Sequence, residues 1–230
     1  MNKRSENLLF HTFDETLRPQ IEELLCIGKS AGADIVEIFL EKSDNISILA
    51  EQDVISNVSP SFGIGAGIRV FLGKKDGFVS TNDLSKPGLL FALTQALGML
   101  GLEISSHNKS EFEGLKHLND FGENKNKWLS ETPDLTESTT KLLESTNLLA
   151  KKNKNLEVRR ASYSRNWQEV IVAATDGVFA RDIRLHQTVG INVIAFKDKG
   201  RSTSSRRYGS SGNPNDLRNW DINHSTNELN

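Results

Sequence analysis

Residues 63–82, GIGAGIRVFLGKKDGFVSTN, carry the pattern that decides the fold. Glycines at every second position, from Gly63 to Gly67, raise the possibility of a phosphate-binding loop. Such a loop needs a strand, then the glycines, then a helix whose N-terminus faces the phosphate. Here a strand-like alternation, IRVFL, follows the glycines, and a polar turn and a second strand-like run follow that. The stretch therefore predicts a β-hairpin, and we expect its glycines to admit backbone or bulky side chains packed against the strand.

Much of this pattern occurs twice in the chain. A shift of 123 residues aligns GIRVF at 67–71 with GINVI at 190–194, and Asp53 with Asp176. The offset holds without a gap over about 45 residues, as expected of an internal repeat. Each copy has an amphipathic helix followed by several strand candidates. The sequence thus predicts an α+β fold, in which two copies of a helix plus antiparallel-strand module form one or two curved sheets. Helices would cover one face and leave the other free.

The predicted elements divide each copy in the same way. Strand candidates are DIVEIFLEK at 34–42, NISILAEQD at 45–53 and VISNVS at 54–59 in copy one, and LEVRRASYS at 156–164, QEVIVAATD at 168–176 and VFARDIRLH at 178–186 in copy two. The last candidate of each copy leads into the glycine hairpin or its counterpart.

A further helix is predicted at 85–101, between the two copies. Ser85 suits its N-cap, Pro87 its first turn and Gly101 its end. The helix is apolar nearly all round, so we expect it to be buried between other elements. The polar stretch 103–131 is interpreted as a surface excursion. We predict one domain at 1–212, with copies at 14–84 and 134–208, and a linker at 213–230.

The composition is that of an ordinary globular protein, with 37% apolar and 25% charged residues. A net charge of −2 provides no overall attraction to nucleic acid or to an anionic membrane. The longest apolar run, at 88–102, is too short to span a bilayer, and the N-terminus lacks the apolar core of a secretory signal. A single cysteine excludes an internal disulfide. These features predict a soluble, cytoplasmic protein that does not bind a membrane.

Candidate catalytic and metal-binding residues are few. The histidines are His11, His107, His117, His186 and His224. None has a partner at the His-Glu-x-x-His spacing that puts two ligands on one helical face. His107 and His117 are interpreted as solvated loop residues, with a shared metal site as the alternative, and His186 is placed on the outward face of a strand. The sequence alone therefore assigns no metal ligand.

Nucleophiles and paired carboxylates are interpreted in the same way. Cys26 lies among leucine and isoleucine on a helix, which favours a small buried apolar residue over a nucleophile. Glu22 and Glu23 fall on the polar side of that helix, and no Gly-x-Ser-x-Gly elbow occurs. We assign no catalytic residue, and the substrate-binding residues stay unknown.

One basic cluster, KDKGRSTSSRRYG at 197–209, allows another interpretation. Its charged residues are Lys197, Lys199, Arg201, Arg206 and Arg207. Such a hairpin can bind phosphates, and Tyr208 could stack on a base. Because an aspartate interrupts the cluster and the chain is slightly acidic, a solvated hairpin is favoured over nucleic-acid binding through residues 197–207.

The hairpin and the segments after it resemble a known family. GIGAGIRVFLGKKDGFVSTNDLS at 63–85, ATDGVFARDIR at 174–184 and SSRRYGSSG at 204–212 resemble the N-terminal half of the TldD/PmbA family, also called modulators of DNA gyrase. The resemblance extends over roughly 33–212, and GFVSTN at 77–82 is its most specific part. More of the motifs resemble TldD than its shorter paralogue PmbA, also called TldE.

This resemblance implies a zinc metallopeptidase that, paired with its paralogue, degrades small unfolded peptides in the bacterial cytoplasm. The family's metal site is a His-Glu-x-x-x-His helix plus a later cysteine, all in the C-terminal half. This sequence contains no such motif, and His224 does not replace it. We therefore expect a truncated, inactive N-terminal domain without bound zinc, whose partner is a PmbA/TldE-type paralogue or a second copy of itself. A non-enzymatic protein-binding module, as the gyrase-modulator name implies, is the alternative.

Overall fold

The structure is a computed structural model that describes residue 13, residues 17–104, 112–117, 135–152, 154–197 and 200–211, and residue 221. These residues form three helices and seven strands. The helices are α1 (Leu17–Ser30), α2 (Lys86–Gly98) and α3 (Leu135–Lys152). The strands are β1 (Ile35–Glu51), β2 (Val54–Leu72), β3 (Lys75–Thr81), β4 (Lys116–His117), β5 (Leu156–Ala174), β6 (Val178–Lys197) and β7 (Gly200–Ser211).

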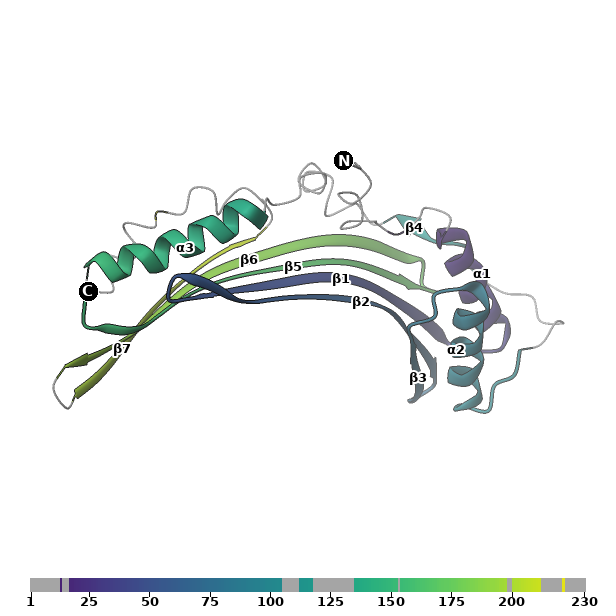
Figure 1. The fold of residues 1–230 in the computed structure, drawn as a ribbon. Helices are drawn as coiled ribbons and strands as arrows, with labels where there is room; N and C mark the ends of the chain where they lie inside the picture. Colours follow the sequence, from purple (N-terminus) through teal and green to yellow (C-terminus); the bar gives the residue numbers. More distant parts are fainter. Residues whose placement is uncertain are drawn as a thin grey trace.

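All seven strands belong to one sheet. Its order is β3-β2-β1-β5-β6, and both β7 and the short parallel strand β4 pair with β6. Figure 1 shows the sheet bent into an arch with all three helices on its convex side, α1 and α2 at one end and α3 at the other. The described helices leave the concave side uncovered. The predicted α+β fold, with helices on one face of a curved sheet, is confirmed.

The two predicted modules are present and lie side by side. The order helix, long strand, long strand, edge strand occurs as α1-β1-β2-β3 and again as α3-β5-β6-β7. The modules join where β1 pairs antiparallel with β5. In that ladder Asp44 faces Trp167, its own counterpart under the 123-residue shift. The two modules are thus related by a pseudo-twofold axis beside Asp44, and they form one continuous sheet.

The strands are longer than predicted. The candidates 34–42 and 45–53 are parts of one uninterrupted strand, β1, and 156–164 and 168–176 are parts of β5. The prediction of separate strands was wrong because the polar residues between them looked like a loop. These residues instead bond across the junction of the modules, where Asn166 donates to Asn45 and Arg165 to Asp44.

The alternation of side chains along the strands separates a buried convex face from the concave face. Next to α1 and α2 the convex face contributes Val36, Ile38 and Leu40 of β1, all fully buried. Beneath α3 it contributes Ile46 and Ile48. The helices therefore cover separate apolar clusters at the two ends of the sheet, and β1 contributes residues to both ends.

Helix α2 begins as predicted but is less buried. The Ser85 side chain accepts a hydrogen bond from the Gly88 N–H, which confirms the N-cap. On the side facing the sheet, Leu89, Leu93 and Leu97 are completely buried. Phe91 on the other side is 66% exposed, so the prediction of burial all round was wrong. The reason is that α2 packs on α1, β2 and β3 and is covered by no further described layer.

Gly77 is required where β3 passes beneath α2. A Cβ on Gly77 would lie 2.4 Å from the carbonyl oxygen of Ala96. We expect Gly77→Ala to lower the free energy of unfolding by about 1–3 kcal/mol, because strand and helix must move apart. Gly98→Ala is the matched control, since a Cβ there has no neighbour within 4 Å and alanine favours a helix. Urea unfolding measures both variants, and a Gly77→Ala protein as stable as the parent would contradict this packing.

Little of the polar excursion 103–131 belongs to the described residues. Lys116 and His117 form β4, so His117 lies in a short strand and not in the solvated loop that was predicted. The prediction was wrong because β4 pairs with β6 at Val178 and Phe179, a contact distant in sequence. The predictions for His107 and for the linker 213–230 concern residues outside the described part, Asp221 excepted. Among the described helices, none combines the length and apolar composition needed to cross a membrane.

Candidate functional site

A groove of about 660 Å³ opens on the concave face at the end formed by β1, β2 and β3. Its lining residues come from all three strands. They are Phe39, Glu41, Ser43, Gly63, Ile64, Gly65, Ala66, Gly67, Phe78, Ser80, Thr81 and Asn82. The groove thus includes the alternating glycines of β2, Gly63, Gly65 and Gly67.

The pairing register places the glycines along the floor of the groove and side chains along one wall. On β1, Phe39 lies opposite Gly67, Glu41 opposite Gly65 and Ser43 opposite Gly63. Paired residues of antiparallel strands point to the same face of a sheet. Three β1 side chains therefore stand beside three β2 positions without side chains.

The second wall comes from β3, which pairs with β2 so that Ser80 lies opposite Gly67. A Cβ on Gly67 would lie 3.0 Å from Cε2 of Phe78, and a Cβ on Gly65 would lie 3.2 Å from the Thr81 carbonyl oxygen. A ring and a backbone group thus occupy the space of the missing side chains. This confirms the prediction that the glycines admit close packing, and the strand β3 after them excludes the phosphate-loop arrangement.

The groove is aromatic and carries one acid. Glu41 is half-buried and is the only ionisable residue among those that line it. No hydrogen bond or ion pair joins its carboxylate to another described residue. The rings of Phe39 and Phe78 stay 40% and 56% exposed. Sequence reasoning missed Phe39, Glu41 and Phe78, because only the pairing register places them beside the glycines.

The second module carries different residues at the place equivalent to the groove. The 123-residue shift places Ser162, Ser164 and Arg201 at the positions of Phe39, Glu41 and Phe78. Arg201 and Arg207 give that end of the concave face a basic character, since both pair with concave-face positions of β6. The two ends of the arch therefore differ in chemistry, although they share a fold.

At the groove's end, the chain turns from β3 into α2. Asp83 follows the lining residue Asn82, and its side chain accepts a hydrogen bond from the Ser85 N–H. Hydrogen bonds from the Ser85 side chain and backbone hold the pKa of Asp83 below its usual value. The carboxylate of Asp83 thus fixes the turn beside the groove.

The residues singled out in the sequence do not gather into a catalytic site. Cys26 is half-buried on α1 and not fully buried as predicted, because only part of its surface meets the core. Glu22 pairs with Arg18 and Glu23 with Lys86, as expected of a polar helix face. Within the described ranges, no three His, Cys, Asp or Glu side chains are close enough to hold a metal ion together. The chain's described residues therefore do not fit a zinc site.

The remaining histidines and the basic cluster are dispersed. His186 is exposed on the concave face beside Ser211, which confirms its outward orientation. His11 and His224, like the Lys199 of the basic cluster, lie outside the described residues. Arg206 and Arg207 are consecutive residues of β7, so they point to opposite faces. Nucleic-acid binding through this cluster stays an untested alternative.

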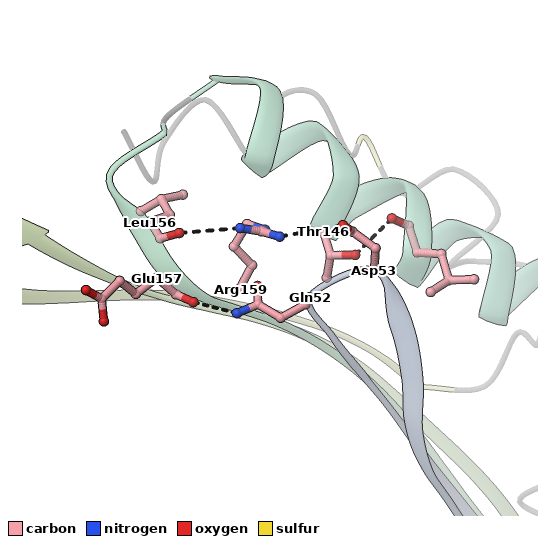
Figure 2. A network of polar contacts seen from close by, with 7 residues as sticks. Gln52, Asp53, Thr146, Leu156, Glu157 and Arg159 are labelled. Carbon is pink, nitrogen blue, oxygen red and sulfur yellow. Dashed lines mark hydrogen bonds and ion pairs between the residues drawn. The ribbon is translucent and has the colours of Figure 1, made fainter.

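A polar network ties the two modules together away from the groove (Figure 2). Arg159 of β5 donates to the Leu156 carbonyl oxygen over 3.4 Å and lies 3.7 Å from the Asp53 carboxylate. Gln52, in the left-handed region at φ 56°, donates through its side chain to the Glu157 carbonyl oxygen. The network holds the β1–β2 turn against β5 beneath α3, so its role is structural.

Comparison with known families identifies the chain. Residues 36–100 match the family model of PmbA/TldA metallopeptidase domain 1, and residues 129–224 match that of the PmbA/TldA metallopeptidase central domain. The chain belongs to the TldD/PmbA family. The resemblance noted in the sequence is thereby confirmed. The first match includes β1, β2, β3 and α2, and the second includes the second module.

Solved structures share the fold of this TldD/PmbA chain at low identity. TldE from Thermococcus kodakarensis has a TM-score of 0.67 and 18% identity over 91% of this chain and 46% of its own. A protein from Thermotoga maritima described as a DNA gyrase modulator has a TM-score of 0.67 and 14% identity, over 92% of this chain and 46% of its own. One from Bacteroides thetaiotaomicron, described in the same way, has a TM-score of 0.64 and 13% identity, over 95% and 50%. The chain spans about half the length of these structures, and no curated protein sequence matches it.

Proposed function

We propose that this TldD/PmbA chain forms a substrate-binding and partner-contacting wall of a zinc metallopeptidase that acts on small unfolded peptides. The observation that carries the proposal is the glycine-floored groove on the concave face, which no described helix covers. An extended peptide needs such a surface, because its backbone must come close to the protein over several residues. The family match supports the reaction class.

The dimensions of the groove suit an extended peptide. Gly63, Gly65 and Gly67 lie at every second residue of β2, so the floor is roughly 13 Å long. That length corresponds to about four residues of extended chain. Because these positions carry no side chains, a peptide can lie closer to β2 than it could over larger residues.

An open strand edge adjoins the groove. Strand β3 pairs with β2 only from Ala66 onward, and in the described part of the chain residues 54–65 have no strand on their outer side. Such an edge can accept another strand, from a peptide or from a partner subunit. Pro60 lacks an N–H in the middle of this edge, which limits indiscriminate pairing.

In this proposal the zinc and its ligands belong to polypeptide outside the described residues. The described residues contain no suitable ligand set, and the chain spans only about half of the structures that it resembles. The peptidase would supply a metal-activated water for hydrolysis, while this chain holds and orients the peptide. The partner is a PmbA/TldE-type paralogue or a second copy of this chain.

Peptide binding by the 230-residue chain tests the proposal. Fluorescence anisotropy with a fluorescein-labelled, unstructured ten-residue peptide is expected to show saturable binding that persists in EDTA, without cleavage of the peptide. Gly65→Val places a branched side chain on the floor and should weaken binding about tenfold or more. Gly209→Val is the matched control, because Gly209 is exposed on the same face of the sheet in β7.

Two results would contradict this function. Equal affinity of the parent and Gly65→Val proteins would show that the peptide does not occupy the groove. Cleavage of the peptide by this chain, together with one bound zinc per chain in metal analysis, would show that the chain itself is the catalyst.

A further inference from the structure

The electrostatics of the groove point to the kind of side chain that it accepts. Its one ionisable residue is Glu41, at the middle of the β1 wall. A half-buried carboxylate loses part of its hydration, and this loss is offset only when a cation or a hydrogen-bond donor approaches it. No described residue provides that partner. The groove therefore has an unmatched negative charge.

The nearby cations are all engaged elsewhere. Lys42 follows Glu41 but points to the convex face, where its Nζ lies 4.9 Å from the centroid of the Phe13 ring. Arg69 lies on the concave face, but its Nε is 2.9 Å from the Asp76 carboxylate, and its guanidinium lies 5.1 Å from the centroid of the Phe71 ring. The nearest charged residue of β1 on the concave face is a second acid, Glu37. Among the described residues, no basic side chain therefore pairs with Glu41.

The exposed rings of Phe39 and Phe78 favour a ligand that also has an apolar part. Phe39 and Phe78 belong to opposite walls, and Gly67 lies between them. Their exposed rings would be covered by an alkyl chain, and their faces attract a cation. A long apolar stem that ends in a positive charge satisfies both the rings and the carboxylate. Among peptide side chains, only arginine and lysine have this form.

We propose that this groove binds an arginine or lysine side chain of an extended peptide, with the stem against Phe39 and Phe78 and the cation at Glu41. The inference rests on the proposed function and names its substrate class: unfolded peptides that contain a basic residue.

A pair of peptides that differ only in charge tests the inference. The probes are fluorescein-labelled Ala-Ala-Arg-Ala-Ala and the same peptide with citrulline, which keeps the shape of arginine but is neutral. On the 230-residue chain we expect the arginine peptide to bind about tenfold more tightly, through its charge-assisted contact with Glu41. The same preference is expected with a lysine and acetyl-lysine pair.

Two variants locate the effect. Glu41→Gln keeps the size of the side chain and removes its charge, so it should abolish the preference for arginine over citrulline. Glu37→Gln is the matched control, since Glu37 lies four residues away on the same face of β1 and does not line the groove. It should retain most of the preference. Equal unfolding curves for both variants would confirm that they are folded.

The outcomes separate this inference from the proposed function. If both peptides bind equally well and Gly65→Val weakens both, the charge preference is wrong and the peptide groove stands. If the arginine preference persists in Glu41→Gln, another acid makes the contact and the inference fails. If neither peptide binds, both the inference and the proposed groove function are overturned.

Discussion

Replacing Asp44 by alanine is expected to lower the free energy of unfolding by about 3–5 kcal/mol, the usual effect of breaking a buried ion pair. Nη2 of Arg165 lies 2.8 Å from Oδ1 of Asp44, and the two side chains are only 1% and 13% exposed. The substitution leaves the guanidinium buried without its carboxylate. Urea unfolding followed by circular dichroism measures the loss.

The position of this pair increases the expected effect. Asp44 belongs to β1 and Arg165 to β5, so the pair lies beside the pseudo-twofold axis where the two modules join. Two residues before Arg165 on the same strand, the hydroxyl of Tyr163 donates a hydrogen bond to the Gln187 side chain over 2.9 Å. Burial raises the pKa of Tyr163, although the nearby Arg165 opposes this shift. Loss of the carboxylate therefore affects a polar layer shared by both modules.

Two control variants test whether the loss of stability depends on the burial of the Asp44–Arg165 ion pair. In an exposed ion pair, Nε of Arg184 lies 2.7 Å from Oδ2 of Asp182, and the Arg184 side chain is 48% exposed. Asp182→Ala removes the carboxylate of this pair. Its effect should stay within about 1 kcal/mol. The double variant Asp44→Ala, Arg165→Met should regain much of the stability that Asp44→Ala loses, because no charge stays buried. An Asp44→Ala protein that unfolds at the parent's urea concentration would contradict the role assigned to this pair.

The sequence predicted local features better than the junction between modules. The hairpin around residue 73, the N-cap at Ser85 and the 123-residue repeat depend on neighbouring residues or on comparison of the chain with itself. The continuity of β1 through residues 43–45 depends on neither of these. These residues are polar because they bond to β5, which follows more than a hundred residues later in the chain. The hydropathy pattern therefore suggested a loop at residues 43–45, where the chain in fact makes the contact between the two modules.

The candidate site shows the same limit. The glycines of β2 were recognised from their spacing, and their function in close packing was predicted. The residues that give the groove its chemistry, Phe39, Glu41 and Phe78, belong to two other strands. Only the register of β1 and β3 against β2 brings them to the glycines, and a single sequence does not fix that register. An acid and two rings on different strands thus became a site only in the folded chain.

The second large effect is expected at Glu169, a fully buried carboxylate on the convex face between the two helix-covered clusters. It accepts a hydrogen bond from the Phe13 N–H over 2.8 Å and from Nε of Arg181 over 2.7 Å. Glu169→Ala removes both interactions, and we expect a loss of about 2–4 kcal/mol. The value is lower than for Asp44 because Arg181 is 31% exposed and regains water.

Glu169→Gln separates the two contributions. The amide oxygen can still accept from the Phe13 N–H, while the charge that pairs with Arg181 is gone, so the loss should be about half as large. Hydrogen exchange at the Phe13 amide gives a local measure: exchange should accelerate strongly in Glu169→Ala and only slightly in Glu169→Gln. Unchanged exchange in Glu169→Ala would show that Glu169 does not hold Phe13. Since Phe13 also lies under Lys42 of β1, this carboxylate of β5 fixes the residue that bridges both modules on the convex face.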